Sequence, residues 1–199
     1  MRLTHAVLVI ADISGYTAFI TNRQTSLLHA EQIITDLLES MIDRTEHPLV
    51  LNKLEGDAAF MYAETGDDRA AAIRDVLLQV SLLFTAFSER LARIRDERSN
   101  CTCNACAKVA DLQLKAFVHC GDIAVKQIRQ FEELAGEDVI LIHRLMKNQV
   151  EGREYVLLTE PVYWAWPEIA ASGQVHREEF DGVGMLELLR LAPGELPRP

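Results

Sequence analysis

Two short segments near the start of the chain place an aspartate beside a glycine where an apolar run ends. They are residues 11–17 (ADISGYT), with Asp12, and residues 53–57 (KLEGD), with Asp57. Two carboxylates held side by side at strand ends offer the hard oxygen ligands that Mg²⁺ or Mn²⁺ prefers. A turn with free backbone N–H groups beside them favours phosphate. The two segments therefore predict a site for a divalent metal and a triphosphate.

The four cysteines form a second candidate site, because all of them lie between positions 101 and 120. Cys101, Cys103 and Cys106 have the spacing Cys-x-Cys-x-x-Cys. Structural disulfides are rare inside cells, so crowded thiols favour a metal, and Zn²⁺ takes four tetrahedral ligands. Cys120 is the candidate fourth ligand, with His119, a distant histidine or a residue of a partner chain as alternatives. A redox-sensitive thiol pair, an iron–sulfur cluster and a loop without metal remain competing interpretations.

Composition indicates one globular domain and excludes some partners. The chain has 199 residues, of which 49% are hydrophobic and 25% charged, and this is ordinary for a single domain. The net charge of −10 makes nucleic acid and anionic membranes poor partners. The sequence shows neither an apolar run of the ~20 residues that a membrane helix needs nor a signal-peptide cleavage region. We expect a cytoplasmic protein.

Apolar periodicity predicts the elements that must position these residues. The pattern indicates a mixture of strands and helices that is typical of an α+β domain with helices packed on one main sheet. We expect this domain over residues 1–192, a cysteine-rich loop over 99–108 and a frayed tail over 193–199. Two hairpins are expected, around Gly121-Asp122 and Asp181-Gly182. Strands are expected over 5–13, 49–53, 58–63, 112–119, 123–129, 155–158, 175–180 and 185–191, and helices over 27–42, 69–98, 136–147 and 161–171.

The order of these elements resembles the catalytic domain of class III nucleotidyl cyclases over nearly the whole chain. The resemblance implies a ferredoxin-like βαββαβ fold with one mixed, mainly antiparallel sheet. It makes Asp12 and Asp57 the two metal-binding aspartates. Lys53, in K-x-x-G-D, becomes the residue that selects the base, and Arg144 the cation that contacts the triphosphate in the transition state. The nucleotide-binding turn would comprise Ile13, Gly15, Tyr16 and Thr17.

The same resemblance implies an activity and an assembly. Cyclases of this class form a head-to-tail homodimer in which each site takes its aspartates from one subunit and its lysine and arginine from the other. The implied reaction converts ATP into cyclic AMP and pyrophosphate with two Mg²⁺ or Mn²⁺ ions. Glu133 lies at the base-recognition position, three residues before Gly136, and with Lys53 it would favour adenine.

Two positions depart from the family pattern and keep other functions open. The transition-state asparagine of the family is replaced by Ile140, which offers no hydrogen bond, and loss of one such contact costs ~10²–10³ in turnover. Glu133 stands where the family has aspartate or a small polar residue. One alternative is therefore an inactive cyclase homology domain that serves as a nucleotide-binding or regulatory dimerisation module. Another is a zinc-stabilised interaction protein in which the cysteine loop is the functional part. Separately, the alternative interpretation of Arg144 is a surface or ion-pair residue.

Overall fold

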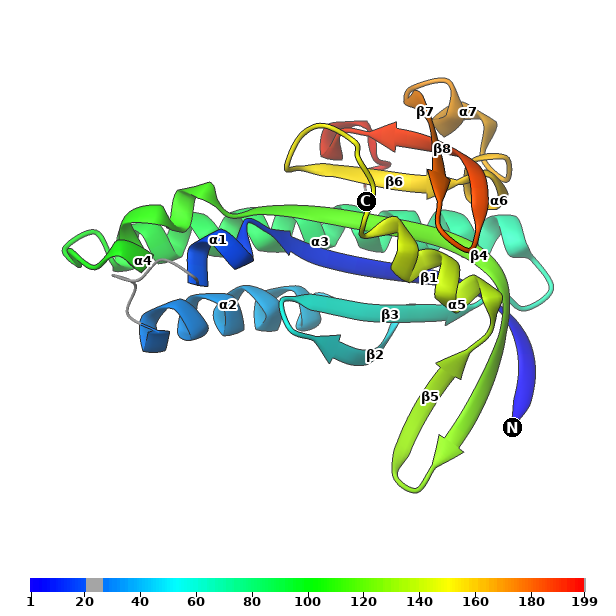
Figure 1. Ribbon diagram of the computed structural model, residues 1–199, viewed down its shortest axis with the longest axis horizontal. Helices are drawn as coiled ribbons and strands as arrows, with labels where there is room; N and C mark the ends of the chain where they lie inside the picture. Colours follow the sequence, from blue (N-terminus) through cyan, green and yellow to red (C-terminus); the bar gives the residue numbers. More distant parts are fainter. Residues whose placement is uncertain (21–26, 199) are drawn as a thin grey trace.

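The computed structural model describes residues 1–20 and 27–198, which are arranged around a single sheet (Figure 1). The strand order is β2-β3-β1-β4-β6-β8-β7, and β5 pairs with β4 at one end. All neighbouring pairs are antiparallel except β4 and β6. The strands are β1 (Arg2–Ser14), β2 (Val50–Glu55), β3 (Ala58–Glu64), β4 (Gln113–Ile128), β5 (Phe131–Ala135), β6 (Tyr155–Thr159), β7 (Gln174–Phe180) and β8 (Gly184–Leu191).

The first four long strands and two helices follow the expected ferredoxin-like pattern. Along the chain the order is β1, α2 (Leu27–Ile42), β2, β3, α3 (Arg69–Glu97) and β4, and in the sheet these strands lie in the order β2-β3-β1-β4. The predicted fold class is therefore confirmed. The α-helices are α1 (Tyr16–Ile20), α2 (Leu27–Ile42), α3 (Arg69–Glu97), α4 (Asn104–Lys108), α5 (Glu137–Leu145), α6 (Glu160–Tyr163) and α7 (Pro167–Ala170).

The central strand β1 serves two hydrophobic cores because its side chains alternate between the faces of the sheet. Val7 and Val9 point to the face that α2 and α3 cover, whereas Leu8 and Ile10 point to the face that α5 crosses. All four are fully buried. A strand that is buried on both faces has an unbroken run of apolar residues in the sequence. This is why the sequence predicts β1 clearly.

Helix α3 is the longest element and forms one wall of the larger core. Asp68 caps it by accepting a hydrogen bond of 2.9 Å from the backbone N–H of Ala71, as an N-terminal aspartate commonly does. By length and composition alone this helix could cross a membrane, which differs from the expectation that the sequence contains no such segment. Its apolar side chains, including Val76, Val80 and Phe87, instead pack in the core against the sheet.

One predicted hairpin is wrong. The chain does not turn at Gly121-Asp122, because β4 continues through both residues, and the turn comes at Arg129 and Gln130. Gly121 meets a different requirement. A Cβ atom at this position would lie 2.2 Å from the carboxylate of Asp138 on α5, so the glycine permits the close approach of α5 to the strand.

Two further segments differ from the sequence expectation. The helix expected over 161–171 is divided into α6 and α7 because Pro167 cannot continue the hydrogen-bond ladder of the preceding turn. The tail expected to fray contains a short 3₁₀ turn over Pro193–Glu195. Leu196, which follows this turn, is buried in the larger core.

Candidate functional site

Asp12 and Asp57 lie next to each other at one end of the sheet. Asp12 is near the end of β1 and pairs with Ala58 of β3, while Asp57 occupies the turn between β2 and β3. The backbone N–H of Ile13 donates a hydrogen bond of 3.2 Å to the carbonyl oxygen of Asp57. This bond fixes the turn against β1, so the two carboxylates share one partly buried location.

The environment of this pair disfavours negative charge. Burial and, to a lesser extent, the negative charge of Asp12 together raise the pKa of Asp57 from its ordinary value of 3.8 to about 6. Burial also raises the pKa of Asp12, although Lys115 partly offsets this effect. Two carboxylates that repel each other while partly removed from water are stabilised by a bound cation. The donor set, with oxygen atoms only, suits Mg²⁺ or Mn²⁺.

The predicted phosphate turn lies between β1 and α1. Gly15 has φ of 97°, a left-handed conformation that glycine adopts without the steric cost of a side chain. Its carbonyl accepts a hydrogen bond of 2.9 Å from the N–H of Phe19, which starts α1. Tyr16 donates from its hydroxyl to Glu31 of α2 at 3.3 Å. These bonds attach the turn to the short helix α1 and to the longer helix α2.

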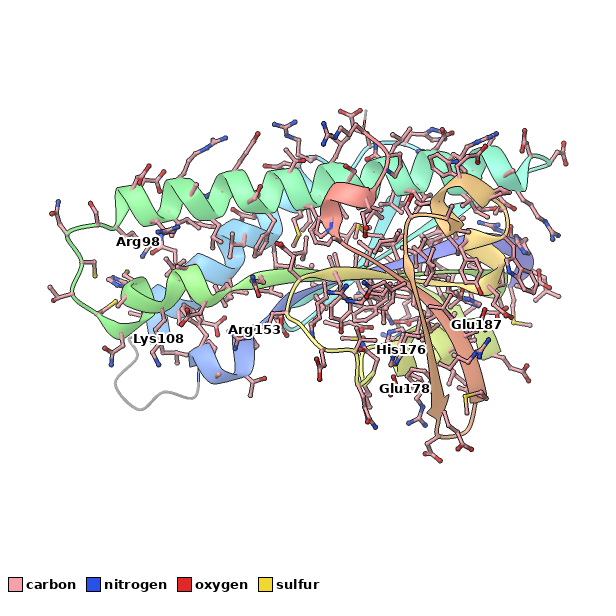
Figure 2. The ribbon with its side chains drawn as sticks, turned by 90° about the horizontal axis from the view of Figure 1, so that it is seen from above. Arg98, Lys108, Arg153, His176, Glu178 and Glu187 are labelled. Carbon is pink, nitrogen blue, oxygen red and sulfur yellow. The ribbon has the colours of Figure 1, made fainter. Side chains whose placement is uncertain are left out.

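Basic side chains from distant segments border this turn. Lys115 on β4 pairs in register with Asp12. Arg153 donates to the carbonyl oxygen of Asp111 at 3.4 Å, and it lines a cavity of about 60 Å³ with Gly15 and Lys108. Figure 2 shows Lys108 and Arg153 at the end of the molecule where α1 lies. Sequence reasoning missed these cations because no local motif connects residues so far apart.

Lys53 and Glu133, which sequence reasoning assigned to base recognition, are in direct contact. The Lys53 ammonium lies 2.8 Å from a carboxylate oxygen of Glu133, and this contact lowers the pKa of Glu133. Lys53 also lies 4.0 Å from Glu55, whose carboxylate is 3.0 Å from Nε2 of His143 on α5. A polar chain thus joins β5, β2 and α5. Glu55 and His143 carried no signal in the sequence beyond their proximity to the motif.

Helix α5 presents Ile140 and Arg144 on the same face, as their spacing predicts. Ile140 is 57% exposed, and both residues line an open, mostly apolar depression of about 300 Å³. The Arg144 guanidinium lies 4.0 Å from Asp181, an exposed ion pair of little energetic weight. Arg144 is therefore available to a ligand that reaches this face.

His119 has a structural role, because both of its ring nitrogens contact other side chains of the same chain. Its Nδ1 lies 2.8 Å from the hydroxyl of Thr159 and its Nε2 lies 2.9 Å from Asp138. Burial lowers the pKa of His119, against the opposing effect of Asp138. Asp138 also accepts a hydrogen bond of 2.6 Å from the backbone N–H of Asp122. These bonds attach α5 to β4.

The structure corrects the expected cysteine grouping. Cys101, Cys103 and Cys106 lie together, but Cys120 is buried in β4 with its sulfur 3.7 Å from Nδ1 of His5. The group that faces the three loop thiols is the imidazole of His29, on the first turn of α2. The sequence left a distant histidine open as an alternative fourth member of the group, and the structure has His29 at that position.

Comparison with solved structures places the fold among class III cyclase domains. The guanylyl cyclase Cya2 superposes with a TM-score of 0.74 at 13% identity, over 95% of this chain and 92% of that chain. A class III adenylyl cyclase-like ATP-binding protein from Pseudomonas aeruginosa superposes with a TM-score of 0.67 at 16% identity, over 82% of this chain and 35% of that chain. The chain therefore has a nucleotidyl cyclase-like fold.

The family can be stated more narrowly from sequence. Residues 34–155 match the family described as "Protein of unknown function (DUF2652)", and the chain belongs to this family. An "Uncharacterized protein Rv2561/Rv2562" of Mycobacterium tuberculosis is 32% identical over 169 residues, which cover 82% of this chain and 76% of the relative. This member of the family therefore has a cyclase-like fold.

Proposed function

We propose that this protein binds a complex of divalent metal and nucleoside triphosphate at an interface between two copies of the chain, and converts ATP into cyclic AMP and pyrophosphate. The observation that carries the proposal is the paired, half-buried Asp12 and Asp57, with the pKa of Asp57 raised to about 6. A purely structural pair of carboxylates that repel each other would reduce stability without compensation. A bound cation and triphosphate supply that compensation.

The chain has residues suited to each part of the substrate. Asp12 and Asp57 would hold Mg²⁺ or Mn²⁺, and the bound metal would lower the negative charge that opposes attack at phosphorus. Lys115 and Arg153 would contribute positive charge beside the turn at Gly15. The contact between Lys53 and Glu133 provides one donor and one acceptor for a purine edge, and Glu133 accepts from the amino group that adenine, unlike guanine, carries at its six-position.

The reaction is an intramolecular displacement. The ribose 3′-oxygen attacks the α-phosphorus, the bond to the bridging oxygen of the β-phosphate breaks, and pyrophosphate leaves while the hydroxyl proton passes to solvent. Negative charge grows on the phosphoryl oxygens during this step. Arg144, which lies partly exposed on α5, would stabilise that charge from the partner subunit, in the way that cations act on transferring phosphoryl groups.

Exposed apolar residues support the pairing of two chains. Ile128 and Phe131, at the tip of the β4–β5 hairpin, are 52% and 59% exposed, and Ile140 on α5 is 57% exposed. The hairpin extends beyond the body of the sheet (Figure 1). Exposed apolar groups on such projections are typical of interaction surfaces. A second chain that covered them would also bring its Arg144 to a shared site.

A specific observation favours a second candidate function. Ile140 puts an apolar side chain on the α5 face where the cyclase reaction uses a hydrogen-bonding one. A domain with this change could bind nucleotide and regulate a partner without turnover. One structural neighbour is described as an adenylyl cyclase-like ATP-binding protein, which is the same combination of a cyclase fold with nucleotide binding.

Product analysis by mass spectrometry tests the proposal. Purified protein is incubated with Mn²⁺ or Mg²⁺ and with each of ATP, GTP, CTP and UTP, beside Asp57→Asn and the matched control Asp67→Asn, whose aspartate is exposed and remote from the site. We expect cyclic AMP from the native protein and from the control, and none from Asp57→Asn. Nucleotide binding in calorimetry without product would favour the second function, and absence of both binding and product would refute both.

A further inference from the structure

We propose that His29, Cys101, Cys103 and Cys106 bind one Zn²⁺ ion that fastens the start of α2 to the segment after α3. Three of these ligands lie in or beside α4, and the fourth comes from a helix more than seventy positions earlier in the chain. All four ligand atoms lie within 4.8 Å of one another. The site is separate from the aspartate pair and does not depend on the nucleotide function.

The distances match a tetrahedral site around one ion. Nδ1 of His29 lies 3.4 Å from the sulfur of Cys103, 3.7 Å from that of Cys101 and 3.9 Å from that of Cys106. With zinc–sulfur bonds of about 2.3 Å and zinc–nitrogen bonds of about 2.0 Å, tetrahedral angles give nitrogen–sulfur separations of about 3.5 Å. The three observed distances bracket this value.

Hydrogen bonding does not account for this arrangement. Cys103 and Cys106 hydrogen-bond each other and Cys101, but these bonds do not explain why three sulfurs surround one imidazole nitrogen. That nitrogen has either one proton to donate or one lone pair to accept with, so it satisfies only one of them. A metal ion at the centre gives all four atoms a common partner. The compact grouping around one point suits a single ion and leaves no space for the bridging sulfides of an iron–sulfur cluster.

Hydrogen-bond donors lie beside two of the three thiols. Cys103 caps α4, and its sulfur accepts a hydrogen bond of 3.5 Å from the backbone N–H of Cys106. Three thiolates, one neutral imidazole and one Zn²⁺ ion carry a net charge of −1. The side chain of Arg98 hydrogen-bonds Cys106 and would offset that charge. Figure 2 shows Arg98 at the end of α3, above the α4 segment that includes Lys108.

The position of the site defines its role. Helix α4 packs against both α1 and α2, and α1 follows directly from the turn at Gly15. An ion shared by His29 and the three cysteines would hold α2 on α4 and so support the outer side of that turn. Helices α1 and α4 have five residues each and bury few apolar side chains. Small structural units of this kind commonly depend on a bound metal.

Metal content and Co²⁺ spectroscopy test the proposal. Protein is prepared without chelator and its zinc and iron are measured by mass spectrometry, then zinc is replaced by Co²⁺ and the visible spectrum recorded. We expect one zinc per chain, no iron, and the intense absorption of a tetrahedral Co²⁺ thiolate site. Cys120→Ser serves as a matched control and should keep both the zinc and the spectrum, and Asp57→Asn should keep them too.

Substitution of the histidine tests direct ligation. His29→Cys should retain one metal per chain and shift the Co²⁺ bands toward those of a four-thiolate site, whereas Cys103→Ser should lose the metal. Circular dichroism shows whether each variant is folded, and the His29→Cys spectrum decides the question even where Cys103→Ser does not fold. Native protein that lacks zinc and does not take up Co²⁺, or a spectrum that His29→Cys leaves unchanged, would overturn the proposal.

Discussion

Replacement of Asp57 by asparagine should stabilise the metal-free protein at neutral pH. An aspartate whose folded pKa lies above its unfolded value adds stability that is fully present below the unfolded pKa and is lost as the pH rises through the folded pKa. For Asp57 this window extends from 3.8 to about 6. The shift corresponds to about 3 kcal/mol at ~1.4 kcal/mol per pKa unit. Since the carboxylate is only partly buried, we expect roughly 1–3 kcal/mol.

Thermal melting in buffer without added Mg²⁺ or Mn²⁺ measures this effect. For a chain of this length, each kcal/mol shifts Tm by about 2–4 °C. Asp57→Asn should therefore melt on the order of 5 °C above the native protein near pH 7.5, and the difference should disappear near pH 4, where the native carboxylate is protonated. Asp67→Asn, with an exposed aspartate, should follow the native curve at both pH values.

Added Mn²⁺ completes the experiment. It should raise Tm of the native protein at neutral pH, because ligands that bind only the folded state stabilise it, and it should have little effect on Asp57→Asn. If Asp57→Asn is no more stable than the native protein at neutral pH, or if its advantage persists at low pH, the electrostatic reasoning for the pair is wrong.

Three further changes probe other parts of the site. Ile140→Asn restores a hydrogen-bonding group on the exposed α5 face and should raise cyclic nucleotide formation by up to ~10², as measured by product analysis, and an unchanged rate would contradict the role given to this position. Gly121→Ala should cost roughly 1–3 kcal/mol in unfolding free energy, because a Cβ 2.2 Å from the Asp138 carboxylate must displace it, whereas Gly194→Ala, with open space at its Cβ, should change it by less than about 0.5 kcal/mol. Glu133→Gln removes the charge paired with Lys53 and should change the ratio of ATP to GTP affinity roughly tenfold in calorimetry, while an unaltered ratio would exclude the pair from base recognition.

The sequence predicts the fold well where the signal is local. The apolar run of β1, the periodicity of α3 and the turn before Asp57 are each visible within a short window, and the order of such elements is enough to define the sheet. The hairpin expected at Gly121-Asp122 fails for a tertiary reason. Glycine followed by aspartate is a common turn signal. Here, however, the glycine is needed because Asp138 of α5 packs closely against the strand, and no local sequence pattern indicates that contact.

In the candidate sites, too, the sequence identifies residues in local motifs but not those brought together by tertiary packing. The aspartates and Lys53 belong to short motifs, so the sequence identifies them directly. His29 is isolated in a helix, and nothing near it marks it as the partner of thiols far along the chain. Arg153 likewise reaches the turn at Gly15 only because a loop between α5 and β6 returns there. Residues of this kind become visible only when the packing of α2, α4 and the sheet is known.

The central position of β1 has a consequence for the synthesis of the chain. Val7 pairs with Ala63 on one side and with Cys120 on the other, so β1 is synthesised before both of the strands that pair with it. At translation rates of ~5–20 residues per second, the β4 partner arrives roughly 6–20 s later. During that interval a strand that is apolar on both faces has an unpaired edge, which is a hazard for aggregation. The nascent chain is therefore expected to need a chaperone, or transient cover by its own α2 and α3, until β4 is complete.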